Sequence, residues 1–126
     1  MRLVTAAIIR RKGKVLITRR GPGEKLAGFW EFPGGKVDGE ESLADCLVRE
    51  LREELGVSIV PGAVLCESDY IYEHGFFRII AMEASTESYN FQLRVHDRIA
   101  WVPLDRLQEF ALLPADKPII DFLKGE

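Results

Sequence analysis

The apolar residues form short runs broken by glycine and by charged residues. Residues 4–9, 15–18 and 99–102 are runs of this kind and are predicted to be strands, the first of them buried. The Lys-Gly-Lys sequence at 12–14 predicts a turn, so the first two strands should form a hairpin. Further β-type runs lie within residues 58–65 and 69–84. Strands therefore dominate the pattern at both ends of the chain.

A helical pattern covers residues 42–55. Apolar residues recur there at every fourth position, at Leu43, Leu47, Leu51 and Leu55. Gly56 follows as a residue suited to the end of a helix. Residues 104–110 and 115–123 are expected to form two short helices near the end of the chain. Strands outnumber helices and the long helix lies mid-chain, which predicts an α/β domain with helices packed on a mixed sheet.

Length and composition favour one globular domain spanning residues 1–126. The chain has a mass of 14.3 kDa, with 47% apolar and 29% charged residues. Its two cysteines are too few for a disulfide framework. The initial apolar run is too short for a signal peptide, and no run approaches the roughly 18 residues that span a bilayer. These features lead us to expect a cytoplasmic protein without a membrane partner.

The net charge of −3 is unevenly distributed. Residues 1–23 carry seven basic side chains and no acidic one, whereas residues 35–57 carry seven acidic and three basic side chains. The low overall charge argues against a nucleic acid polymer as a partner. The local acidic excess coincides with the predicted helix.

Three glutamates lie together at one edge of the apolar face of that helix. At about 100° per residue, with Leu43 at zero, Glu54 falls near 20°, Glu50 near −20° and Glu53 near −80°. Glu50 and Glu54 are like charges four residues apart, an arrangement that destabilises a helix. A solvated acidic face, with Arg49 pairing with Glu53, is one interpretation. The other is a site for Mg²⁺ or Mn²⁺, which prefer such oxygen ligands.

The spacing of these residues resembles the Nudix box. Gly35, five residues, Glu41, seven residues, Arg49-Glu50-Leu51, one residue, Glu53-Glu54, one residue and Gly56-Val57 match its pattern over residues 35–57. The preceding GFWEFPGGK and the later LPADKP segment extend the likeness. The chain is similar to the MutT-type branch of the Nudix hydrolases, and most of all to the small CTP pyrophosphohydrolases of that branch.

This resemblance implies a Nudix α/β/α sandwich and hydrolysis of a nucleoside triphosphate to a monophosphate and pyrophosphate. Carried over by position, the metal ligands would be the carboxylates of Glu50, Glu53 and Glu54 and the backbone carbonyl of Gly35. The catalytic group would comprise those glutamates with Arg49, and either Glu53 or Glu54 would accept a proton from water. Glu41 and Gly56 would have structural roles in the box.

The resemblance also implies a substrate site. Arg20 matches a position that contacts substrate phosphate, whereas neighbouring Arg19 is expected to be structural, since adjacent strand residues face opposite ways. Phe32 matches a position that lines a base pocket. Asp116 would accept from a base amino group or, if protonated, donate to a ring nitrogen. The alternative for Asp116 is an N-cap of the last helix.

One expected carboxylate is absent. Related enzymes often carry it in the loop before the strand that holds Trp101, where this chain has Val95; Asp97 is a candidate replacement. His74 and His96 have no partners at metal-ligand spacing, so neither is expected to bind a metal. Tyr70, Tyr72 and Trp30 are candidates for either the pocket or the core.

These features together predict a Mg²⁺-dependent pyrophosphohydrolase acting on (d)NTPs, with cytidine nucleotides favoured and Mn²⁺ as an alternative ion. A MutT-type enzyme that removes 8-oxo-dGTP is the second hypothesis, and a noncatalytic nucleotide-sensing module is the third. The protein would be a monomer or a homodimer.

Overall fold

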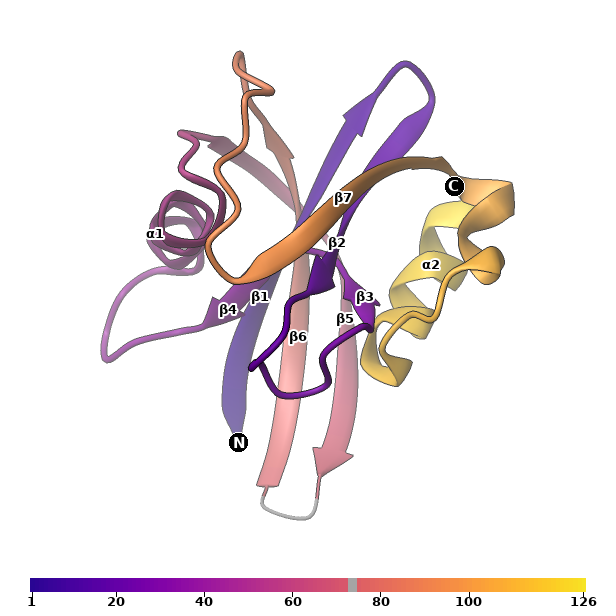
Figure 1. The fold of residues 1–126 in the computed structure, drawn as a ribbon. Coiled ribbons are helices and arrows are strands. Elements are labelled where there is room, and N and C mark those ends of the chain that lie inside the picture. The colour runs from indigo at the N-terminus through magenta and orange to yellow at the C-terminus, as the bar shows by residue number, and fades with distance from the viewer. Residues whose placement is uncertain (73–74) are drawn as a thin grey trace.

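The structure, a computed structural model, describes residues 1–72 and 75–126, without the side chain of Tyr72 (Figure 1). Its elements are β1 (Arg2–Arg11), β2 (Lys14–Arg20), β3 (Trp30–Glu31), β4 (Gly34–Lys36), α1 (Leu43–Leu55), β5 (Val60–Tyr72), β6 (Gly75–Ser85), β7 (His96–Pro103), the 3-10 helices η1 (Leu104–Glu109) and η2 (Pro114–Asp116), and α2 (Lys117–Lys124). Of the sequence predictions, the one for His74 lies outside the described residues.

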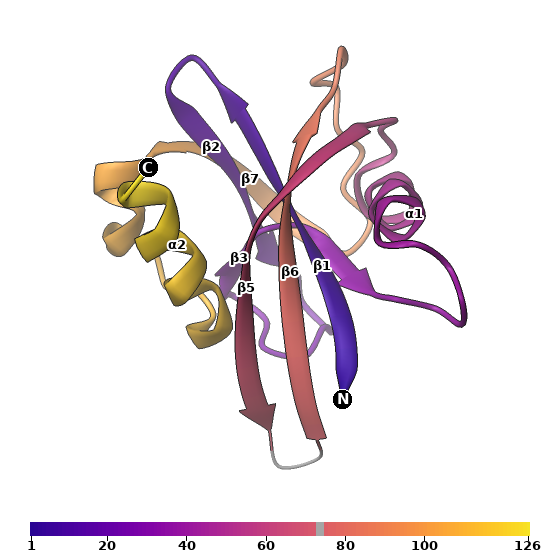
Figure 2. The same ribbon diagram turned by 180° about the vertical axis from the view of Figure 1, so that it is seen from behind.

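Strand β1 is the centre of a mixed sheet. It pairs in parallel with β6 and antiparallel with β4 and with the start of β2. Strand β5 pairs with β6, and β2 pairs with β3 and β7, all antiparallel (Figure 2). The predicted mixed sheet and the hairpin at residues 12–14 are confirmed.

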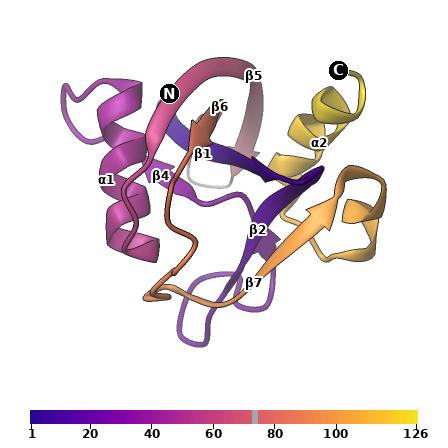
Figure 3. The same ribbon diagram turned by 90° about the horizontal axis from the view of Figure 1, so that it is seen from above.

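The helices lie on opposite sides of the strands (Figure 3). Alternate residues of β1 explain this arrangement: Ala6 and Ile8 pack in the cluster that contains the α2 residues, whereas Ala7 and Ile9 pack in the cluster that contains the α1 leucines. Both faces of β1 are thereby covered, which is why residues 4–9 form a nearly continuous apolar run. The predicted α/β/α sandwich is confirmed.

Helix α1 begins and ends as its sequence predicts. The Ser42 hydroxyl accepts a hydrogen bond from the Asp45 N–H at 3.1 Å, and Gly56 ends the helix with a left-handed φ of 66°. Leu47, Leu51 and Leu55 are fully buried, which orients the glutamate edge next to them.

Two segments differ from the sequence prediction. Residues 69–72 belong to β5 rather than to the following strand, and shifts of register between Pro61 and Cys66 break the two-residue alternation that would have shown a single long strand. Residues 104–109 form a 3-10 helix, and the last predicted helix divides into η2 and α2. Within the described residues, no helix is long and apolar enough to cross a membrane.

Candidate active site

Arg49 joins the acidic residues at the edge of α1. Its Nε and Nη2 donate to both carboxylate oxygens of Glu41, at 3.0 and 2.7 Å. Its Nη1 donates to Glu50 Oε1 at 2.9 Å and to Glu53 Oε2 at 3.3 Å. One guanidinium thus holds three carboxylates, where the sequence alone suggested a pair with Glu53.

Glu41 ties the loop before α1 to the helix. Besides Arg49, it accepts a hydrogen bond from the Asp38 N–H at 2.9 Å, and Arg49 Nη2 also donates to the Lys36 carbonyl at 3.1 Å. The hydrogen bonds from Arg49 and Asp38 lower the pKa of Glu41 to about 2. Through these contacts Glu41 and Arg49 hold the loop before α1 against the helix.

Glu54 lies deeper than the other box glutamates, and the nearest effect of a cation on it is the charge of Arg20, which lowers its pKa only slightly against the other causes. Its Oε1 accepts a hydrogen bond from the Gly34 N–H at 3.3 Å, and no ion pair to Glu54 exists among the described residues. Burial, followed by the charges of Glu31 and Glu50, raises the pKa of Glu54 to about 9. Burial also raises the pKa of Glu50. Before a cation binds, this edge of α1 is therefore short of positive charge.

Gly35 is packed against Glu50. A Cβ at this position would lie 2.3 Å from the Glu50 carboxyl carbon, so any larger residue would displace the carboxylate. The Gly35 carbonyl accepts from Thr5 Oγ1 at 3.3 Å and from Cys46 Sγ at 3.6 Å. The structure therefore shows this carbonyl in an interior contact, and its role as a metal ligand stays a prediction.

The carboxylate oxygens at this edge of α1 suit a hard divalent cation, but they are not arranged around a single point as ligands would be. Glu50 and Glu53 both contact the same Arg49 nitrogen, and the Glu53 side chain is 60% exposed. In the described part of the chain, no group of three His, Cys, Asp or Glu side chains is arranged to hold a metal ion as it stands. Carboxylate oxygens that Arg49 now occupies would have to turn towards the ion.

Arg20 belongs to a second charged group. Its Nη1 donates to Glu31 Oε1 at 3.0 Å, and its Nε donates to the Lys25 carbonyl at 2.7 Å. The other Glu31 oxygen lies 2.9 Å from His96 Nε2. Neither Glu31 nor this role of His96 was found from the sequence, since no spacing rule joins residues 20, 31 and 96.

Arg19 and Asp97 form a separate pair. Two Arg19 nitrogens donate to the two Asp97 oxygens at 2.8 Å each. The expected structural role of Arg19 agrees with this geometry. The carboxylate of Asp97 is therefore paired with Arg19 on the neighbouring strand, and its role as a replacement for the absent loop carboxylate stays a prediction.

Asp116 is a buried acid beside Phe32. Its Oδ2 accepts from the Phe32 N–H at 3.4 Å, and burial, followed by the charge of Glu31, raises its pKa to about 8. Its side chain makes no capping hydrogen bond to α2, so the N-cap alternative is wrong. The Phe32 side chain is only 3% exposed and packs in the core, so its part in a base pocket stays a prediction.

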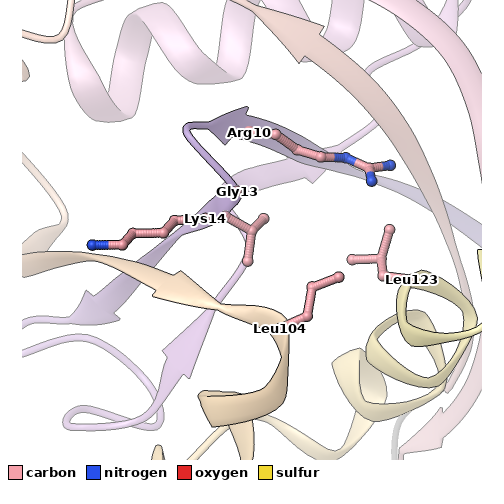
Figure 4. Close-up of a pocket in the computed structure, with 6 residues that line it drawn as sticks. Arg10, Gly13, Lys14, Leu104 and Leu123 are labelled. Atoms are coloured by element: carbon pink, nitrogen blue, oxygen red, sulfur yellow. The ribbon is translucent and has the colours of Figure 1, made fainter.

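Other candidates from the sequence are core residues or lie apart from the site. Trp30 packs edge-on against Phe110, and Tyr70 packs against the core. A separate hollow of about 130 Å³ lies between the β1–β2 hairpin, η1 and α2 (Figure 4). Its Arg10 is paired with Glu126 at 2.6 Å, and the hollow takes no residue from α1.

Comparison with known proteins places this site in a family. The model of the NUDIX domain matches residues 4–122, so the chain belongs to the NUDIX domain family. It is a Nudix hydrolase, a class that acts on small nucleotide substrates and in general needs a divalent metal ion.

Two curated relatives cover most of the chain. One is the CTP pyrophosphohydrolase of Escherichia coli (strain K12), 35% identical over 94% of this chain and 87% of that protein. The other is the putative 8-oxo-dGTP diphosphatase 2 of Mycobacterium tuberculosis (strain ATCC 25618 / H37Rv), 34% identical over 91% of this chain and 82% of that protein.

Solved structures agree with this assignment. The solution structure of the E. coli ORF135 protein has a TM-score of 0.86 and 33% identity, covering 99% of this chain and 89% of that one. The MutT NUDIX hydrolase from Burkholderia pseudomallei has a TM-score of 0.84 and 29% identity, covering 97% of each chain.

Proposed function

We propose that this Nudix hydrolase is a Mg²⁺-dependent pyrophosphohydrolase that converts a nucleoside triphosphate and water into a nucleoside monophosphate and pyrophosphate. The observation that carries the proposal is Glu54, a largely buried carboxylate beside Glu50 that forms no ion pair among the described residues. A divalent cation would relieve both the repulsion and the desolvation of this pair.

Glu50, Glu53 and Glu54 are the residues that would hold the ion. When bound, Mg²⁺ or Mn²⁺ would offset the charge of the triphosphate and make a bound water more acidic. Water's oxygen forms the new bond to phosphorus, the anhydride bond to pyrophosphate breaks, and Glu53 or Glu54 accepts the proton. Arg49 keeps Glu50 and Glu53 together.

Arg20 is the proposed phosphate contact. Its Nε and Nη1 already donate to Lys25 and Glu31, and no described residue accepts from Nη2. That nitrogen is therefore available to an anion, for which a guanidinium is a suitable donor.

Asp116 is the proposed base contact, and its raised pKa favours cytosine. Below pH 8 its carboxyl is mostly protonated, so it can donate to cytosine N3 and accept from the N4 amino group at once. An ionised carboxylate would suit the two N–H donors of guanine instead. The relative named CTP pyrophosphohydrolase supports the same preference. Cytidine nucleotides are accordingly the preferred substrates in this proposal.

Pyrophosphate release tests the proposal. With Mg²⁺ present, CTP, dCTP, 5-methyl-dCTP, dGTP and 8-oxo-dGTP are compared at equal concentration, and ADP-ribose, whose hydrolysis yields AMP and ribose 5-phosphate rather than pyrophosphate, is followed by AMP formation. The cytidine nucleotides are expected to turn over fastest. An advantage of 8-oxo-dGTP beyond about tenfold, which corresponds to about 1.4 kcal/mol, would instead support an 8-oxo-dGTP diphosphatase. Binding without release would indicate a nucleotide-sensing module.

A pair of matched variants tests the metal site. Glu53→Gln should remove most of the turnover and weaken Mg²⁺ binding, whereas Glu40→Gln, the same change at an exposed residue before α1, should leave both unchanged. Equal activity of the two variants would contradict the assignment of the carboxylates.

A further inference from the structure

We propose that Glu31 is a positioning residue that holds the Arg20 guanidinium ready for the phosphate chain, with His96 fixing Glu31 from the other side. This inference rests on the proposed role of Arg20 in phosphate binding. It concerns a residue outside the Nudix box, on β3, that makes no contact with the ions or the reacting atoms in the proposal above.

The geometry is a chain of three side chains from three strands. Glu31 on β3 uses one oxygen for Arg20 Nη1 at 3.0 Å and the other for His96 Nε2 at 2.9 Å. Arg20 ends β2, and His96 begins β7, and the two residues are paired in the sheet. Since both Glu31 oxygens have partners, its carboxylate cannot rotate without breaking a contact.

The exposure of these three side chains increases from the interior of the protein to its surface. The side-chain exposure is 0% for His96, 15% for Glu31 and 25% for Arg20. The inner end is therefore rigid, and the outer end is the one that a ligand can reach.

The protonation pattern of His96 supports its role as an anchor. Its Nδ1 is buried and has no hydrogen-bond partner among the described residues. A buried N–H without an acceptor is more unfavourable than a buried ring nitrogen without a donor, so the geometry assigns the ring proton to Nε2, which faces Glu31. His96 then donates to Glu31, and Glu31 accepts from both neighbours.

Arg20 needs such an anchor because of its place in the strand. A register shift lies between Arg19 and Arg20, and the loop from residue 21 follows directly. A long side chain at a strand end has many rotamers, and ordering them on binding opposes affinity. The hydrogen bonds to Glu31 and to the Lys25 carbonyl restrict the guanidinium before the substrate arrives. They use Nε and Nη1, so Nη2 remains available to an anion.

The charge of Glu31 also acts on both halves of the proposed site. Its charge is the second-largest cause of the raised pKa of both Glu54 and Asp116, after burial. A residue at this place can hold a phosphate-binding side chain between the metal-binding edge of α1 and the base-contacting Asp116.

The test is a double-mutant cycle measured as KM and kcat for CTP with saturating Mg²⁺. Glu31→Ala should raise KM about tenfold with kcat within about threefold, a change of the size expected for losing one charge-assisted contact. Arg20→Ala should raise KM at least as much. In the Arg20→Ala background, Glu31→Ala should add nothing, because its effect passes through Arg20.

Matched variants separate positioning from a general loss of structure. Glu31→Gln keeps an acceptor for Arg20 but turns its NH₂ group towards the His96 N–H, so its KM should lie between those of wild type and Glu31→Ala. Asp69→Ala removes an equally well-formed ion pair, with Arg78 between β5 and β6, and should leave KM unchanged. If Glu31→Ala does not fold, His96→Leu is measured instead, in the wild-type and in the Arg20→Ala background. His96→Gln, which keeps a donor for Glu31, is then the conservative variant.

The possible outcomes are distinct. If Arg20→Ala raises KM but Glu31→Ala leaves it unchanged or lowers it, or if the two effects multiply, the positioning role is wrong and the proposed function stands. If Arg20→Ala itself leaves KM unchanged, the phosphate assignment fails and this inference fails with it. Equal effects of Asp69→Ala and Glu31→Ala would also overturn it.

Discussion

Replacing Arg49 should destabilise the protein, and Mg²⁺ should offset part of that loss. Arg49 is the only described side chain that holds Glu41, Glu50 and Glu53 together. In the Arg49→Ala variant these carboxylates would repel one another without a cation. A bound divalent ion would again bring Glu50 and Glu53 a positive partner, but it would leave Glu41 without one.

The magnitude follows from the contacts. Arg49 is 31% and Glu41 18% exposed, and two hydrogen bonds join them. Hydrogen bonds to charged groups contribute about 1.5–3 kcal/mol when buried, and exposed ion pairs about 0.2–1 kcal/mol. For this partly exposed group we expect a loss of about 2 kcal/mol in the free energy of unfolding, or about 8 °C in Tm.

The assay is urea unfolding followed by circular dichroism, with and without saturating Mg²⁺. The gap between wild type and Arg49→Ala should fall from about 2 to about 1 kcal/mol when Mg²⁺ is added. Arg52→Ala is the control: it is the same change on the same helix, at an exposed side chain, and should lie within about 0.5 kcal/mol of wild type. A gap that Mg²⁺ widens, or an Arg49 effect as small as that of Arg52, would refute the reasoning.

Three further predictions concern single residues. Gly35→Ala should lose most Mg²⁺-dependent turnover, measured by pyrophosphate release, but less than about 1 kcal/mol of stability in urea unfolding, because its Cβ would displace only the flexible end of the Glu50 side chain. The stability gap between wild type and Glu41→Gln should be full above pH 4.5 and close as pH falls towards 2, because the lowered pKa stabilises only the ionised form; a gap that persists at pH 2 would contradict this. The KM for CTP should rise above pH 8 as Asp116 ionises but stay flat in Asp116→Asn, whose amide is both donor and acceptor; a flat wild-type profile would contradict the base contact.

The sequence predicts the layers and the long helix well, because their signals are local. The four-residue spacing of the leucines, Ser42 before them and Gly56 after them define α1 within a residue or two. The apolar run at residues 4–9 indicates a strand covered on both faces, which β1 is. The limits of β5 were missed because its bulges interrupt the alternation on which strand prediction depends.

In the site, too, the features with a local sequence signal could be predicted and those that depend on strand pairing could not. The glutamates of the box share one helix, so their common edge follows from the helical period, and the structure shows Arg49 between them. Glu31 and His96 come from different strands, and only the pairing of β2 with β3 and β7 brings them to Arg20. Asp97 was a reasonable substitute by distance along the chain, but its carboxylate contacts Arg19 instead.

The chemistry of Asp116 also depended on the fold. From the sequence, an acid at the start of a short helix is equally consistent with an N-cap and with a base contact. The structure shows a buried carboxyl that faces the Phe32 N–H and makes no cap. Its raised pKa, which underlies the proposed preference for cytosine, arises from burial and from Glu31, and neither could be read from residue 116 alone.

The most direct test of the central claim is pyrophosphate release from CTP by the wild-type chain and by Glu53→Gln, each titrated with Mg²⁺. We expect saturable Mg²⁺-dependent release of pyrophosphate and CMP by the wild type, and a loss of at least about a hundredfold in Glu53→Gln with an unchanged circular dichroism spectrum. Release that is independent of Mg²⁺, or a folded Glu53→Gln variant with wild-type turnover, would contradict the assignment of the α1 carboxylates as the metal-binding catalytic site.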